Sequence, residues 1–63
     1  MIYLVIRQDD NGVCYVMADR LAQNEAQRLV DIMTARAHKA TYMPCGYHNA
    51  AQRRQILQTH CIH

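Results

Sequence analysis

The longest regular pattern of hydrophobic and polar positions lies in the middle of the chain, over residues 22–38. The apolar side chains recur at the i, i+4, i+7, i+8 spacing of one helical stripe, and they are Ala22, Ala26, Leu29, Val30, Met33 and Ala37. Polar residues fill the positions between them, so one face is solvated and the other must pack on a partner layer. The pattern predicts an amphipathic helix, with Leu21 as its hydrophobic staple and Glu25 as the reaching residue of a capping box.

Two short runs rich in β-branched and large apolar residues precede this helix, at residues 1–8 and 13–18. Asn11-Gly12 lies between them, and this dipeptide is the strongest short-range hairpin signal because both residues tolerate the positive φ of a two-residue turn. The cross-strand pairs expected from that loop are Ile6 with Met17, Arg7 with Val16, and Val5 with Ala18. A four-residue loop would shift the pairs but keep the same faces.

Both faces of the predicted hairpin are largely apolar. One face is expected to hold Ile2, Leu4, Ile6, Val13, Tyr15 and Met17, and the other Tyr3, Val5, Cys14, Val16 and Ala18 with Arg7. A hairpin with one face in water should instead alternate apolar and polar residues. The second face is therefore expected to be covered, either by the C-terminal segment or by another molecule.

Residues 40–43 read as a short third strand that Pro44 ends, which suggests an edge position because proline cannot donate to a central ladder. Residues 45–48 follow as a turn. Asn49 and Gln52 are a plausible cap pair for a weaker second helix over about residues 50–59. The predicted fold is a small α+β domain spanning residues 1–63, with a three-stranded antiparallel sheet in the order ββαβ, one main helix and a weaker C-terminal helix.

Size and composition limit the function classes. A chain of 63 residues is near the lower limit for a core without disulfides, a metal or a partner, and its net charge of +2 is far from that of a dedicated nucleic-acid binder. There is no long apolar run and no secretory signal pattern, so neither a membrane span nor export is expected. Three cysteines without a framework spacing favour reduced thiols. These features predict a cytoplasmic protein.

Two chemical sites can be drawn on the sequence. Cys45-x-x-His48 followed by His60-Cys61-x-His63 offers zinc ligands, but the spacing matches no known zinc module, and a buried cysteine with polar tail histidines is the simpler explanation. Cys45 with His48, or Cys14 with Asp9, could be drawn as a nucleophile and its partner. A chain this short with two glycines has little means to build a pocket around them. We therefore expect no metal, no cofactor and no enzymatic activity.

The succession IYLVIRQDDNGVCYVMADR, LAQNEAQRLVDIMTARAHKATY resembles, in layout, the many small β-hairpin–helix–strand proteins of bacteria and their phages. The resemblance covers the first two thirds of the chain. It is carried by the Asn-Gly hairpin, the Leu21 staple, the Ala26/Leu29/Val30 stripe and the Lys39-x-Thr41-Tyr42 exit. Phage and prophage proteins of this layout often bind and inhibit a host enzyme or defence complex, and the resemblance implies the same kind of role here.

The sequence thus predicts a non-catalytic protein-binding accessory or inhibitor that acts on a host protein or complex, with a homodimer as a further option. Arginine and tyrosine usually carry interface energy. The expected partner-binding residues, taken to be exposed, are Tyr42, Tyr47, His48, Arg53 and Arg54. The alternative is a small RNA- or DNA-binding module that uses the same surface together with Arg36 and Lys39.

Overall fold

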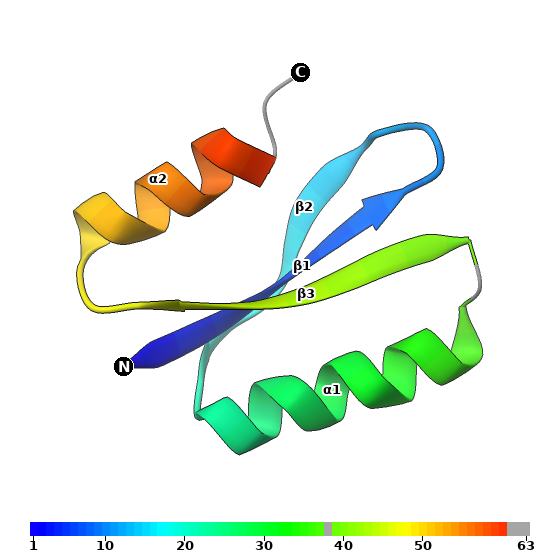
Figure 1. Cartoon of the computed structure of the whole chain (residues 1–63), viewed down its shortest axis with the longest axis horizontal. Coiled ribbons are helices and arrows are strands. Elements are labelled where there is room, and N and C mark those ends of the chain that lie inside the picture. Colours follow the sequence, from blue (N-terminus) through cyan, green and yellow to red (C-terminus); the bar gives the residue numbers. More distant parts are fainter. Residues whose placement is uncertain (38, 61–63) are drawn as a thin grey trace.

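Three antiparallel strands form the centre of the molecule, with one helix on each side of the sheet (Figure 1). The computed structural model describes residues 1–37 and 39–60. Its elements are β1 (Ile2–Asp9), β2 (Cys14–Leu21), α1 (Gln23–Arg36), β3 (Ala40–Tyr47) and α2 (Ala50–His60), and the strand order is β2-β1-β3. The predicted α+β fold is confirmed, and the second face of the sheet is covered by the C-terminal helix.

The hairpin between β1 and β2 turns through three residues rather than two. The Gly12 N–H donates to the Asp9 carbonyl at 3.1 Å, and the Asp9 N–H donates to the Val13 carbonyl at 3.0 Å. Gly12 has a φ of 85°, in the region that favours glycine. The Asp9 carboxylate also accepts the N–H groups of Asn11 and Val13, both at 3.0 Å. Asp9 therefore begins a β-turn that ends at Gly12.

This loop length moves the register of β2 by one residue. Ile6 lies opposite Val16, and Arg7 lies opposite Tyr15, so the expected pairs Ile6–Met17 and Arg7–Val16 are wrong. Because successive side chains of a strand point to opposite faces, a shift of one residue exchanges the faces of β2. The resulting clusters hold Tyr3, Val5 and Met17 on the side of α1, and Leu4, Ile6, Cys14 and Val16 on the side of α2.

Further along, β2 contains two bulges relative to β1. Val5 pairs with Ala18 and Tyr3 pairs with Leu21, so β2 has one extra residue before Ala18 and another after it. The first bulge explains why the expected pair Val5–Ala18 is found despite the shifted turn. Arg20 lies in the second bulge with a φ of 58°, a conformation that costs a residue other than glycine about 1 kcal/mol. The strand runs on to Leu21, beyond its predicted end at residue 18.

The apolar stripe of α1 packs on the sheet as predicted. Its cluster contains buried Ala26 and Val30, with Leu29, Met33 and Ala37 packed against Val5 and Tyr42. The helix is shorter than residues 22–38, because Ala22 is its N-cap and Ala37 its C-cap. The Glu25 side chain accepts the Ala22 N–H at 2.9 Å. This is one of the two hydrogen bonds of a capping box, and the other is missing because an alanine side chain has no acceptor.

β3 runs through Pro44 to Tyr47, so the predicted strand end at residue 43 and the predicted turn at 45–48 are wrong. The strand does lie at the edge of the sheet, as proline suggested, since β1 is its only neighbour in the described part of the chain. Gly46 lies opposite Tyr3. A Cβ at Gly46 would contact the side chains of Met1 and Tyr3, of which the exposed Met1 side chain can move aside.

α2 lies where it was predicted, and its cap pair is confirmed. The Asn49 side-chain oxygen accepts the Gln52 N–H at 2.9 Å, and the Gln52 side-chain oxygen accepts the His48 N–H at 2.6 Å. No residue of α2 is buried. Its apolar contact with the sheet is made by half-buried Ile56 and Leu57, which pack against the cluster of Leu4, Ile6 and Tyr47.

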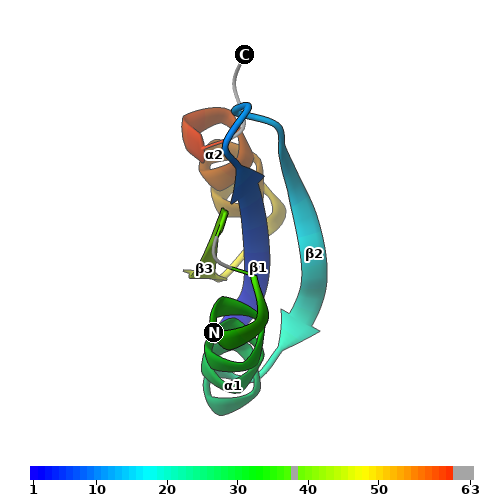
Figure 2. The same cartoon turned by 90° about the vertical axis from the view of Figure 1, so that its right-hand side faces the viewer.

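Both helices lie over β1 and β3 and leave β2 alone at one side of the molecule (Figure 2). The shortest Cα dimension, across the three strands, is only 11 Å. β1 contains the three largest fully buried side chains of the described chain, Leu4, Val5 and Ile6, whereas β2 contains no buried residue. The core is thus centred on β1 and β3.

Candidate partner-binding surface

The five residues predicted to bind a partner lie in different environments. Tyr42 and Tyr47 are 6 % and 7 % exposed, so the expectation that they are exposed is wrong. They were misplaced because β3 continues past Pro44, and alternation then directs Tyr42 towards α1 and Tyr47 towards α2. His48 and Arg54 are exposed, and Arg53 is half-buried.

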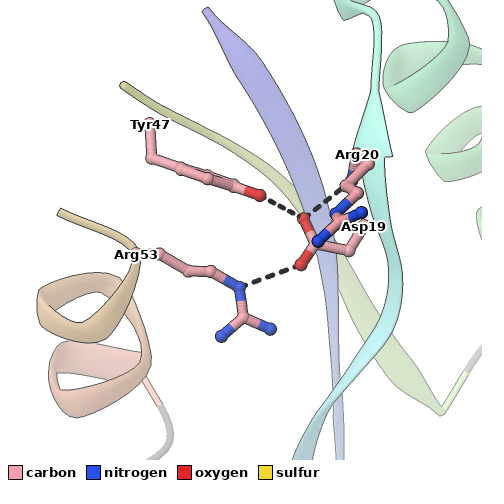
Figure 3. A network of polar contacts seen from close by, with 4 residues as sticks. All are labelled: Asp19, Arg20, Tyr47 and Arg53. Carbon is pink, nitrogen blue, oxygen red and sulfur yellow. Dashed lines mark hydrogen bonds and ion pairs between the residues drawn. The ribbon is translucent and has the colours of Figure 1, made fainter. Parts of the chain in front are cut away.

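Tyr47 and Arg53 belong to a polar network centred on Asp19 of β2 (Figure 3). The Tyr47 hydroxyl donates to Asp19 Oδ1 at 2.6 Å, and the Arg53 Nε donates to Asp19 Oδ2 at 2.9 Å. The backbone N–H of Arg20 adds a third hydrogen bond to Oδ1 at 2.7 Å. The Asp19 side chain is 25 % exposed and that of Arg53 37 %. The network joins β2, β3 and α2, and it holds a helix that has little apolar contact of its own.

The charge of Asp19 is stabilised by these donors. Partial burial acts to raise the pKa of Asp19, but the hydrogen bonds from Tyr47, the Arg20 N–H and Arg53, with the charge of Arg53, hold it below its ordinary value. In return, the hydrogen bond to Asp19 raises the pKa of the Tyr47 hydroxyl, and burial acts in the same direction. The carboxylate therefore stays ionised and the phenol stays protonated at neutral pH.

Beside this network runs an open groove of about 640 Å³. It brings together three of the predicted residues, Tyr47, His48 and Arg53, with Asp19 and others that the sequence did not indicate. Tyr42 lies on the opposite side of the sheet, and Arg54 is not in the groove lining. Its charged lining consists of the Asp19–Arg53 ion pair and the exposed Arg20, and the groove follows the seam between α2 and the sheet.

A second surface follows the uncovered strand, and we name it the β2 edge surface. It consists of Val13, Tyr15, Met17, Leu21, Leu29 and Ile32. Val13, Tyr15 and Ile32 are 53 %, 47 % and 45 % exposed, and they are three of the five large apolar residues that stand out as exposed in the described chain. Leu21, Leu29 and Ile32 line a groove of about 320 Å³ between α1 and the end of β2, rimmed by Glu25 and Arg28.

Arg7 of β1 contacts a tyrosine on each of the two edge strands, β2 and β3. Its Nε donates to the Tyr42 hydroxyl at 3.2 Å, and its guanidinium lies 6.0 Å from the centre of the Tyr42 ring and 5.6 Å from that of Tyr15. The hydrogen bond to Tyr42 is the main reason why the pKa of Arg7 is raised. Tyr15 is thus held against Arg7 on one side while its other side remains open to solvent.

Residues 1–37 and 39–60 hold no group of three or more His, Cys, Asp and Glu side chains that could bind a metal ion. His48 and His60 line one shallow groove of about 370 Å³, whose other walls are apolar, amide or hydroxyl side chains and Gly46. Cys61 and His63 lie outside the described residues, so their part of the zinc hypothesis is not described here.

The cysteines of the described chain differ. Cys14 is disulfide-bonded, so the expectation of reduced thiols is wrong for this residue. Cys45 is a free, half-buried thiol, and burial raises its pKa. A raised pKa lowers the thiolate fraction and therefore the nucleophilicity of Cys45.

Comparison with known protein families, with curated proteins and with solved structures gives no match. In the described part of the chain, neither α1 nor α2 is long and apolar enough to cross a membrane. Among the described residues, the β2 edge surface contains three of the five exposed large apolar side chains, which makes it the strongest candidate surface for a partner.

Proposed function

We propose that this chain is a small, non-catalytic protein-binding protein, and that it binds its partner along the β2 edge surface. The observation that supports this most directly is an eight-residue edge strand without any buried residue, which contains exposed Tyr15 and lies beside exposed Val13 and Ile32. An unpaired strand offers backbone N–H and C=O groups to an added strand, while neighbouring pockets select its side chains. The proposed role is that of an accessory or inhibitor of a host protein or complex, of phage or prophage type. The cytoplasmic location stays a prediction from the sequence, and the disulfide bond of Cys14 argues against it because such bonds are rare in the cytosol.

The nucleic-acid alternative has less support. The rings of Tyr42 and Tyr47, which would stack on bases, are buried, and Tyr47 and Arg53 are engaged by Asp19. Stacking and free cationic groups are what a single-strand binder requires. His48 and Arg54 are exposed. Their role as additional contacts for a protein partner stays a prediction.

Site-specific photocrosslinking tests the proposal. A benzophenone side chain in place of Tyr15 keeps an aromatic group at the β2 edge surface, and the same group in place of exposed Gln55 on α2 is the matched control. In cells that produce the protein, we expect covalent adducts with a second, different polypeptide from position 15 and few from position 55. Equal yields from both positions, or no such adduct from position 15, would contradict the proposed function.

A further inference from the structure

We propose that a second copy of this chain also occupies the β2 edge surface, by antiparallel pairing of the two β2 strands into one continuous sheet. The inference rests on the proposed function, because both use the same surface and a target protein would displace the second copy. Three features of the surface support it: the distribution of charge along β2, the apolar side chains beside it, and the contrast with β3.

Charge along β2 suits pairing with itself. Residues 13–18 carry no charge, the turn before them contains Asp10, and Arg20 follows them. Asp9 and Asp19 are engaged within the chain, the first by turn N–H groups and the second by Tyr47 and Arg53. Asp10 and Arg20 are exposed, and neither forms an ion pair among the described residues.

A two-fold axis at Tyr15 would place Arg20 of each copy opposite Asp10 in the turn of the other. A two-fold interface is self-complementary, so every contact occurs twice. Opposite charges across neighbouring strands stabilise a sheet, and like charges destabilise it. Antiparallel self-pairing therefore creates two favourable contacts, whereas parallel self-pairing would place Asp10 beside Asp10 and Arg20 beside Arg20.

The apolar side chains of the surface are suited to the same arrangement. Val13, Tyr15 and Met17 of one copy would become cross-strand neighbours of the same residues in the other, and aromatic and β-branched pairs are favourable in this position. Burial on the second copy would enlarge a core that is small in one chain, where only seven apolar residues of the described part are buried.

The other edge of the sheet is unsuited to self-pairing. β3 lies between the two helices, and Pro44 removes a backbone donor from its centre. The arrangement thus favours β2 for the second copy, with regular pairing over residues 13–16, which precede both of its bulges.

Sedimentation equilibrium of the full chain over a range of concentrations tests the inference. We expect a reversible dimer of the wild-type chain. Val13→Lys places a charge at the surface in both copies and is expected to raise the dimer dissociation constant roughly tenfold. The matched control Ile2→Lys adds the same charge to an isoleucine that is 43 % exposed and outside this surface, and it should leave the constant unchanged. A wild-type chain that stays monomeric into the millimolar range, or equal weakening by both variants, would overturn the inference.

A charge exchange tests the pairing itself. Asp10→Arg and Arg20→Asp should each weaken the dimer, and the double variant should recover wild-type affinity, because the unlike contact is restored with its signs reversed. Single variants that weaken the dimer without recovery in the double variant would contradict antiparallel pairing. Circular dichroism of each variant shows whether its fold is intact.

The two proposals can fail separately. A monomeric chain that still crosslinks from position 15 to a different polypeptide overturns the second-copy inference and leaves the proposed function intact. If the chain is a dimer and position 15 crosslinks only to another copy of the same chain, the second-copy inference is supported. The proposed role as an accessory or inhibitor of another protein is then contradicted.

Discussion

The two edge strands of the sheet have the same length and the same neighbour, β1, but opposite surroundings. β3 lies between α1 and α2 and contains the buried side chains of Tyr42 and Tyr47. β2 lies outside both helices, contains two bulges and has no buried residue (Figure 2). Residues that favour sheets are a minority in both strands, so the position of the helices, and not strand propensity, decides which edge belongs to the core and which is left for a partner.

A matched pair of substitutions tests this contrast with the largest expected effect. Tyr42→Ala empties a buried site, removes the hydrogen bond from Arg7, and should lower the free energy of unfolding by about 3–5 kcal/mol. Tyr15→Ala removes a half-exposed ring that also contacts Arg7, and should cost about 1 kcal/mol or less. Urea unfolding at a concentration that keeps the chain monomeric measures both. Equal losses would show that β2 belongs to the core as much as β3 does.

The next prediction concerns α2, which depends on a polar network where α1 depends on apolar packing. Asp19→Ala removes the acceptor for Tyr47 and Arg53 and should cost about 2 kcal/mol. The control Asp31→Ala, on the exposed face of α1, removes only a hydrogen bond from Gln27 and should cost less than about 0.5 kcal/mol. Hydrogen exchange of the α2 amides should accelerate in the first variant alone. If Asp19→Ala lowers the free energy of unfolding but the α2 amides exchange no faster than those of α1, the network does not hold the helix.

Acidification should weaken the same network. The folded-state pKa of Asp19 lies below its ordinary value of 3.8, so its contribution is fully present above that value and is lost as pH falls through the folded pKa. Asp19→Asn should remove this part of the pH dependence. The difference in unfolding free energy between wild type and Asp19→Asn should therefore shrink as the pH is lowered below about 4. A difference that stays constant with pH would mean that the charge of Asp19 contributes nothing.

The smallest expected effect tests the second bulge of β2. Arg20→Gly relieves a positive φ while keeping the backbone hydrogen bond to Asp19, and should stabilise the monomer by about 0.5 kcal/mol after the entropic cost of glycine. Thermal unfolding at low concentration measures this change. A destabilised variant would indicate that the Arg20 side chain contributes more to the folded monomer than its exposure suggests.

Much of this architecture could be predicted from local patterns. The stripe of Ala26 and Val30, the Glu25 cap, the Asn49–Gln52 cap pair and an edge position for Pro44 each follow from the residue types at one place in the chain. Such signals require no knowledge of distant contacts, and the structure confirms them.

The wrong predictions lie where a change in the length of a loop or strand alters the register or the face of the residues after it. Asn11-Gly12 was interpreted as a two-residue turn, although Asp9 with Gly12 three residues later is also the signature of the longer turn that forms. Pro44 predicts the end of a strand that in fact continues to Tyr47, and the prediction that Tyr42 and Tyr47 are exposed is wrong for the same reason. Asp19 was missed as the partner of Tyr47 and Arg53 because their contacts span 28 and 34 residues and depend on the bulges of β2.

The central claim is that β2 is the edge that accepts another chain, and amide NMR spectra of the wild-type protein from micromolar to millimolar concentration test it most directly. We expect concentration-dependent shifts over residues 13–18 and in Ile32, with the amides of β3 and α2 unchanged. Shifts that appear first along β3 or α2, or spectra that do not change at all while a partner binds elsewhere, would contradict the account.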